Sequence, residues 1–293
     1  MLRLRGFPLG EVSDLPNRRR RTLRRAVKTE GIGLHSGKPV QLSLIPSRND
    51  GRICRRTDLD GAEIPLSLSS VVPSQWATLL SVNGVTVSTV EHLLAALYAL
   101  EIDDVLVEVD GEEFPALDGS AARYLDLVES AGSVDTDEEI APVRVTEPFW
   151  ISGEEKHIIA FPSDRLKVTY AVDYHHAVIG KQFISLDIAG ESFREELAPA
   201  RTFALEEWIE GLREKGLAAG GSLENAIVVH PDRYSTELRF ENEMVRHKAL
   251  DLVGDLALIG RPVCAHVMAV CCSHAMHLAM ARRILDANVP VAY

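Results

Sequence analysis

A histidine and an aspartate lie four residues apart, at His247 and Asp251. Residues at i and i+4 share one face of an α-helix, so both side chains could bind one metal ion. An imidazole and a carboxylate suit zinc, whose catalytic sites take three protein ligands and leave a fourth position for water. An exposed ion pair on an ordinary helix explains the same spacing, and it is the commoner meaning of an isolated H-x-x-x-D pattern. A zinc site therefore requires a third ligand.

Two adjacent residues, Glu91 and His92, could supply the missing groups. His92 would be the third ligand, and Glu91 would take a proton from the attacking water. The alternative is a capping box that begins at Ser88, with Glu91 as its N3 residue and His92 as a polar residue beside the apolar stripe. In either interpretation, a helix N-terminus would keep Glu91 anionic.

A further histidine, His274, follows two cysteines and a serine at the start of a predicted helix. An imidazole in that place could protonate a leaving amine or stabilise an oxyanion. A half-buried histidine of an ordinary helix cap is the alternative.

Hydrophobic periodicity predicts the elements that would position these residues. Apolar residues at helical spacing predict helices from Ser88 onward, after the segment 118–120, and over residues 205–217, 244–259 and 274–285. Alternation of apolar and polar residues predicts strands over residues 40–44, 105–109, 143–151 and 167–174. The acidic segment 135–139 and Pro142 mark a boundary between a first α+β domain, 22–138, and a second, 139–293. No sequence repeat shows that the two are duplicates.

Composition excludes several classes of protein. The 293 residues are 46% hydrophobic, which is enough to build the cores of two domains. The net charge is −12, but residues 1–25 contribute +6 through eight arginines and two acidic residues, and the remainder is acidic enough to repel nucleic acid. Residues 1–21 are predicted to form a flexible basic leader, with the arginine run 18–25 solvated and mobile.

The remaining features of composition concern compartment and redox state. The sequence shows neither a membrane span nor a secretory signal, so we expect a cytoplasmic protein. The four cysteines have no C-x-x-C spacing, which predicts reduced and mostly buried thiols.

From residue 22 onward, the chain resembles the UDP-3-O-acyl-N-acetylglucosamine deacetylases. The matching segments, in order, are residues 31–37 (GIGLHSG), 88–93 (STVEHL), 117–121 (LDGSA), 200–203 (ARTF) and 240–255, which contains VRHK. The resemblance implies that His92, His247 and Asp251 hold Zn²⁺, that Glu91 is the general base and that His274 is the general acid or an electrostatic partner of the transition state. Among supporting residues, it implies that Thr202 helps to hold the oxyanion, that Lys248 lies beside charged groups of the substrate, that Asp255 orients His274 and that Phe203 faces the sugar.

The same resemblance implies a fold and a reaction. The expected fold is two similar α+β domains packed face to face around the site, with a βαβ insertion near residues 203–229 that lines an acyl-chain passage. The expected reaction is hydrolysis of the N-acetyl group of UDP-3-O-(3-hydroxyacyl)-N-acetylglucosamine, the committed step of lipid A biosynthesis. Apart from the resemblance, we expect a monomer. The chain departs from the family pattern at Ser273, where glycine is usual, and at His277, where asparagine is usual. A non-catalytic paralogue that binds the UDP-sugar or zinc, and a zinc amidohydrolase for a related acylated amino sugar, are the alternatives.

Overall fold

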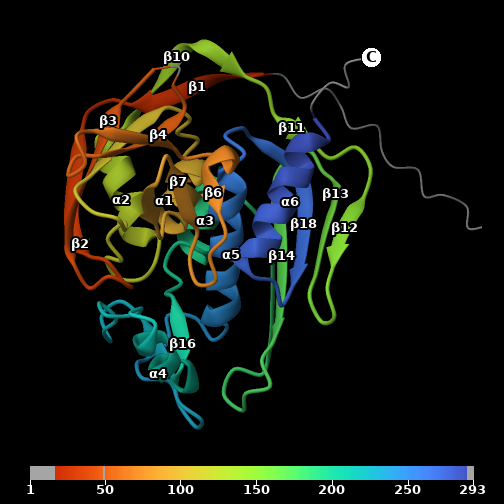
Figure 1. Cartoon of the computed structure of the whole chain (residues 1–293). Helices are drawn as coiled ribbons and strands as arrows, with labels where there is room; N and C mark the ends of the chain where they lie inside the picture. Colours follow the sequence, from red (N-terminus) through yellow and green to blue (C-terminus); the bar gives the residue numbers. More distant parts are fainter. Residues whose placement is uncertain (1–16, 49, 289–293) are drawn as a thin grey trace, which may run out of the picture.

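The computed structural model describes residues 17–48 and 50–288. These residues form two halves, each with a mixed β-sheet and helices packed against it (Figure 1). This confirms the predicted α+β class. Among the described residues, no helix has the length and apolar character needed to cross a membrane.

The first half is built on a five-stranded sheet. Its strands, in chain order, are β2 (Val27–Ile32), β3 (Pro39–Pro46), β4 (Arg52–Arg56), β5 (Ala62–Pro65) and β9 (Val105–Val109). Helices α1 (Glu91–Ala99) and α2 (Ala122–Ala131) share a hydrophobic core with this sheet. The short helix η1 (Leu68–Ser70) and a small sheet of β6 (Val71–Val72), β7 (Leu79–Val82) and β8 (Val85–Ser88) lead into α1.

The second half has the corresponding elements. Its strands are β12 (Phe149–Ser152), β13 (His157–Pro162), β14 (Lys167–Asp173), β15 (Lys181–Asp187) and β18 (Val263–Val270), and the short β11 (Val143–Arg144) also pairs with β18. The helices are α3 (Gly190–Glu196), α5 (Glu243–Ala257) and α6 (His274–Asp286). The helices predicted over 244–259 and 274–285 are thus confirmed.

The two sheets have the same topology. The strand orders are β2-β3-β9-β4-β5 and β12-β13-β18-β14-β15. In both, the central strand pairs in parallel with one neighbour, and every other pairing along the order is antiparallel. A parallel pair needs a crossover connection, and α1 and α5 lie in the two equivalent crossovers. The halves are therefore topological duplicates, although the sequence shows no repeat.

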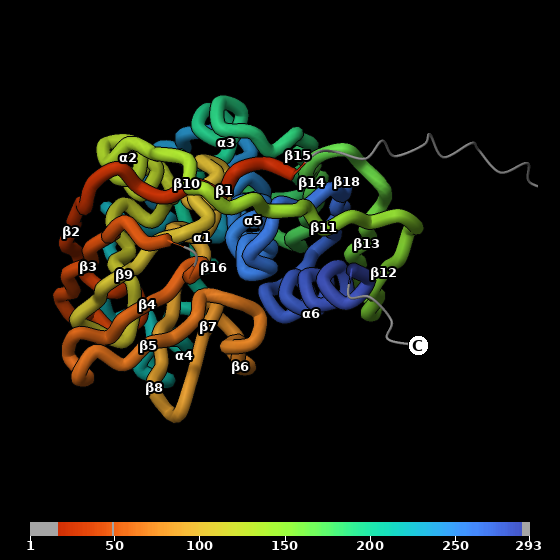
Figure 2. The backbone as a smooth tube through the Cα atoms, turned by 90° about the horizontal axis from the view of Figure 1, so that it is seen from above, coloured from red at the N-terminus to blue at the C-terminus, as the bar shows by residue number. Residues whose placement is uncertain are grey.

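Helices of the two halves pack against each other between the sheets (Figures 1 and 2). The central contact joins α1 to α5, and both helices contribute fully buried residues to the surrounding core, among them Leu93, Leu97, Leu250 and Val253. A Cβ added at Gly254 would overlap the carbonyl oxygen of Glu91, so the close approach of the two helices depends on this glycine. Residues of α1 and α5 are consequently held at short and fixed distances.

A small βαβ unit lies beside this core, as predicted for residues 203–229. Strand β16 (Phe203–Leu205), helix α4 (Glu206–Glu214) and strand β17 (Ile227–Val229) form it, and the two strands pair in parallel. Figure 1 shows this unit projecting below the two halves. Its own apolar cluster contains Leu205 and Ile227.

The arginine run is part of the fold, and its prediction as a mobile leader was wrong. Strand β1 (Arg18–Leu23) pairs antiparallel with β10 (Ser133–Ile140), the connection between the halves. Arg18 makes two hydrogen bonds to Asp103, of 2.6 and 2.9 Å, and Arg20 makes two to Asp104, of 2.8 and 2.5 Å. Both carboxylates are buried and need cationic partners. Residues 1–16 of the predicted leader lie outside the described residues.

The capping box predicted at Ser88 is also absent from the start of α1. The helix begins at Glu91, and Ser88 is the last residue of β8, where its backbone bonds to Glu112 and Phe114. Thr89 adopts a φ of 57°, a left-handed conformation in which its hydroxyl donates to Glu113 Oε1 at 3.0 Å. This turn leaves the Glu91 side chain free to enter the interior instead of bonding back to a cap.

Candidate active site

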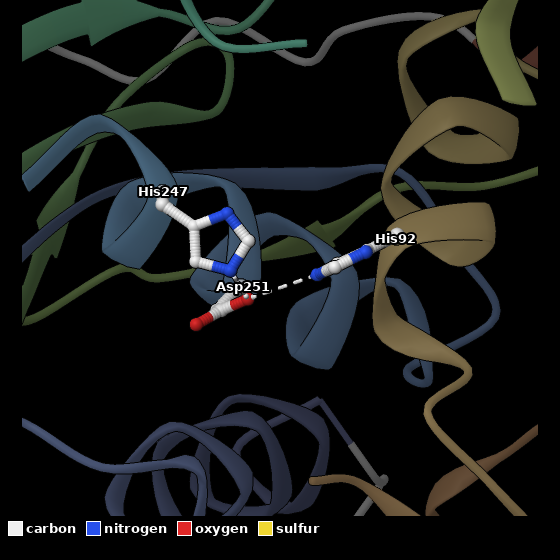
Figure 3. Close-up of side chains that lie close together, drawn as sticks. All are labelled: His92, His247 and Asp251. Atoms are coloured by element: carbon white, nitrogen blue, oxygen red, sulfur yellow. Dashed lines mark ion pairs between the residues drawn. The ribbon is translucent and has the colours of Figure 1, made fainter. Parts of the chain in front are cut away.

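The three predicted metal ligands meet where α1 contacts α5. Figure 3 shows His92 extending from α1 toward His247 and Asp251 of α5. Asp251 Oδ1 lies 3.3 Å from His247 Nε2 and 3.7 Å from His92 Nε2. All three residues are buried, and their donor atoms lie within 4.8 Å of one another, close enough to hold one metal ion. The exposed ion pair considered for His247 and Asp251 does not describe this arrangement.

The protonation of these side chains fits a metal centre. His247 Nδ1 lies 3.0 Å from the carbonyl oxygen of Ala200, to which it can donate a hydrogen bond. The other nitrogen, Nε2, then carries no hydrogen, and its lone pair is available to bind a metal. Burial lowers the pKa of His247 to about 4, despite the opposing charge of Asp251, so the imidazole is neutral as a ligand must be. Burial alone would raise the pKa of Asp251, but its electrostatic interactions with His247 and Lys248 outweigh burial and hold that pKa well below its ordinary value.

Glu91 lies next to this cluster at the first position of α1. Its Oε1 is 3.9 Å from His274 Nε2. We expected the helix N-terminus to keep Glu91 anionic. Burial instead raises the pKa of Glu91, and its electrostatic interactions with His274 and His92 offset this only in part. A carboxylate whose pKa is raised accepts a proton more readily, which suits a general base.

His274 is the first residue of α6 and lies near both Glu91 and Asp251. Its Nδ1 is 2.8 Å from Asp255 Oδ2, while its Nε2 is 3.8 Å from Asp251 Oδ2. Burial lowers the pKa of His274, but the charge and hydrogen bond of Asp255 outweigh it and raise the pKa to about 9. The imidazole is therefore protonated near neutral pH, with its Nε2–H on the side of the metal-ligand cluster.

The serine before His274 does not disturb the loop. Ser273 has φ −112° and ψ 169°, an extended conformation that any residue adopts. The left-handed residue of this loop is Cys271, with φ 51°. All four cysteines are free, and three of them are buried, as predicted.

The supporting residues of the prediction lie around the same centre. Lys248 Nζ is 2.8 Å from Asp251 Oδ2, and this charge, working against burial, raises the pKa of Lys248. The Phe203 ring lies edge-on to the His247 ring, with 6.5 Å between centroids. Thr202 is fixed through its backbone, because its N–H donates to Gly119 and its carbonyl accepts from Ile227. Asp255 is fully buried and is not among the residues that line the cavity.

A cavity of about 920 Å³ joins this centre to the βαβ unit. At one end it is lined by the polar side chains Glu91, His92, Thr202, His247, Lys248, Asp251 and His274. Toward the βαβ unit its wall is more apolar and includes Trp208, Leu212 and Val228. Trp76 of the first half also lines the cavity and contacts Trp208, with 6.1 Å between ring centroids.

Some functional contacts come from residues that the sequence reasoning missed. Thr78 donates to Asp255 Oδ1 at 2.5 Å, and the backbone N–H of Thr78 lies 3.4 Å from Glu91 Oε2. Glu113 accepts from the backbone N–H groups of His35 and Ser36, both at 2.8 Å, and from Thr89. Glu113 thus ties the segment 31–37 to the turn that starts α1. Neither residue belongs to a local pattern that would mark it in the sequence.

Comparison with known proteins gives the family. The family model of the UDP-3-O-acyl N-acetylglycosamine deacetylases matches residues 20–286. Among the relatives, the UDP-3-O-acyl-N-acetylglucosamine deacetylase of Chlamydia abortus is 42% identical over 277 residues, which cover 93% of this chain and 99% of that protein. The enzyme of the same name from Chlamydia pneumoniae is 41% identical, with 92% and 98% covered. Since the family model spans most of the chain and these relatives match it over nearly their whole length, the chain belongs to the UDP-3-O-acyl N-acetylglycosamine deacetylase family.

Proposed function

We propose that this protein hydrolyses the N-acetyl group of UDP-3-O-(3-hydroxyacyl)-N-acetylglucosamine with the help of zinc. The products are UDP-3-O-acyl-glucosamine and acetate, and the reaction is the committed step of lipid A biosynthesis. The observation that carries the proposal is the meeting of His92, His247 and Asp251 beside Glu91 and His274 at one end of a large cavity. Family membership supports the substrate.

The three ligands are a donor set that suits zinc. Two neutral imidazoles and one carboxylate, with a position left for water, are the usual shell of a catalytic zinc ion. Bound here, zinc would lower the pKa of a coordinated water to about 7 and polarise the amide carbonyl.

The residues around the ligands account for the proton transfers. Glu91 accepts the proton of the attacking water, and the Nε2–H of His274 donates to the departing nitrogen or stabilises the oxyanion that precedes it. Asp255 orients His274 through the 2.8 Å contact at Nδ1. In this proposal, the Thr202 hydroxyl supplies a further hydrogen bond to the oxyanion.

The cavity accounts for substrate recognition in the same proposal. Lys248 and Thr202 contact the polar groups of the substrate, Phe203 faces the sugar, and the acyl chain extends along the apolar wall of the βαβ unit. Trp208, Leu212 and Val228 form that wall, whereas Leu205 and Ile227 belong to the unit's own core. A cytoplasmic location and a monomeric state remain predictions.

A combined metal and activity assay tests the function. The purified protein should contain about one zinc ion per chain and release acetate from the UDP-sugar; a chelator should stop the release, and added zinc should restore it. Binding of the UDP-sugar without acetate release would support the non-catalytic alternative. Faster turnover of another acylated amino sugar, in a panel of substrates, would support the related amidohydrolase.

His274→Ala tests the role of the second-half histidine. The variant should keep its metal, because the ligands are complete without His274, and should lose about a hundredfold or more in kcat as general acid catalysis is removed. The control is His266→Ala, which removes a histidine of β18 that bonds to Thr169 and does not line the cavity. Loss of zinc in His274→Ala would make His274 a ligand, and unchanged kcat would exclude it from catalysis.

A further inference from the structure

A second histidine, His277, contacts the carboxylate that orients His274. His277 lies one turn further along α6 and is fully buried. Its Nδ1 is 2.9 Å from Asp255 Oδ2, the same oxygen that lies 2.8 Å from His274 Nδ1. The two rings stand at 71° to each other, with 5.8 Å between centroids. Asp255 is therefore held between two imidazoles of one helix.

The acceptor sites of Asp255 show how completely this carboxylate is fixed. Oδ1 accepts from the hydroxyl of Thr78, and Oδ2 accepts from both histidines. Each carboxylate oxygen has two lone pairs, so the two histidines occupy both sites of Oδ2. A carboxylate with three donors around it cannot rotate without breaking a hydrogen bond in a buried place, which is costly.

The other ring nitrogen of His277 contacts the sheet of the second half. Nε2 lies 2.9 Å from the hydroxyl of Tyr170 on β14, and the same hydroxyl lies 2.9 Å from the carbonyl oxygen of Cys272. Burial lowers the pKa of His277, although the hydrogen bond and charge of Asp255 oppose this. The ring contacts Asp255 Oδ2 through Nδ1 and the Tyr170 hydroxyl oxygen through Nε2, while the single hydrogen of that hydroxyl can donate to the Cys272 carbonyl oxygen.

These contacts give His277 a role in catalysis without contact with the substrate. His277 does not line the cavity, and its two ring nitrogens contact Asp255 and the Tyr170 hydroxyl. We propose that His277 is a positioning residue, which locks the Asp255 carboxylate in the orientation that holds His274 for proton transfer. The inference rests on the proposed function, because it requires His274 to act in the reaction.

Two amide substitutions separate the contacts of His277. In His277→Asn, the side-chain nitrogen takes the place of Nδ1 and can still donate to Asp255. In His277→Gln, the amide reaches the place of Nε2 and can bond only to Tyr170. His277→Leu removes both contacts at similar volume. We expect His277→Asn to keep kcat within about threefold, and His277→Gln and His277→Leu to lose about tenfold or more in kcat with little change in KM.

The test is completed by measuring zinc content and the thermal unfolding midpoint, and by combining each substitution with His274→Ala. Each His277 variant should keep its zinc. His277→Leu should lower kcat far less in the His274→Ala background than in the wild type, because His277 acts on the reaction through His274. Equal losses in both backgrounds, a kcat of His277→Leu close to wild type, or a kcat of His277→Asn as low as that of His277→Leu would overturn the proposal. A purely structural role would lower the unfolding midpoint without this coupling. Full activity of His274→Ala alone would instead contradict the catalytic role assigned to His274.

Discussion

Replacement of Asp251 by alanine is expected to remove the metal and abolish acetate release. Asp251 is the one anionic donor of the three, and its Oδ1 lies within 3.7 Å of both histidine Nε2 atoms. Its loss leaves two neutral ligands and also deprives Lys248, whose Nζ is 2.8 Å away, of its nearest carboxylate. His92→Ala should have the same outcome, because it removes the only ligand from the first half. Metal analysis of each purified variant, beside an acetate-release assay, measures both effects.

The matched control is Asp126→Ala, which removes an exposed aspartate of α2 that pairs with Arg194. This variant should keep its zinc and its turnover. Because Asp251 is buried, activity alone does not distinguish loss of the metal from unfolding, so circular dichroism of each variant belongs to the measurement. If folded Asp251→Ala and His92→Ala both retain a full equivalent of zinc, the ligand assignment is wrong.

Glu91→Gln should separate metal binding from proton transfer. The amide has nearly the same shape as the carboxylate but cannot accept the proton of the attacking water. We therefore expect zinc content and KM close to wild type, and a loss of about two to four orders of magnitude in kcat. The buried position of Glu91 and its raised pKa are the reasons to expect a large effect. Steady-state kinetics with metal-loaded enzyme give the answer.

Glu108→Gln is the matched control, since Glu108 is a glutamate of β9 that pairs with Arg55 and does not line the cavity. Its kinetics should be those of the wild type. If Glu91→Gln turns over substrate within a few-fold of the wild-type rate, Glu91 is not the general base and has only a structural role at the start of α1. Loss of zinc from the same variant would instead place Glu91 among the metal ligands.

The helices of the site could be predicted from the sequence because their signals are local. The apolar period over residues 244–259 predicted α5 within two residues, and that helix alone brings His247 and Asp251 to one face. The pairing with His92 was different, since no local pattern says that α1 and α5 meet. That contact came from the resemblance, and the structure gives its physical basis in Gly254 and the apolar residues around it.

Features that depend on distant partners could not be predicted. The arginines of β1 pair with carboxylates at 103 and 104, more than 80 positions away, so a rule about local charge blocks gave the wrong result. Ser88 satisfies the pattern of a capping box, but it lies in β8, and its backbone groups are hydrogen-bonded to Glu112 and Phe114. Thr78 and Tyr170 are single polar residues in ordinary strands or loops, and only the fold brings them to Asp255 and His277.

The pairing of β1 with β10 also determines how the molecule can move. A hinge requires a few connecting residues that can change φ and ψ freely. Here the connection between the halves is itself a strand, with Ser133 to Ile140 paired to Leu23 to Arg18, so bending it must break ladder hydrogen bonds. The βαβ unit is also tied to the first half, because the backbone N–H groups of Ala219 and Gly220 donate to the carbonyl oxygens of His35 and Leu34. We therefore expect the two halves to stay in one relative orientation while substrate enters and leaves the cavity.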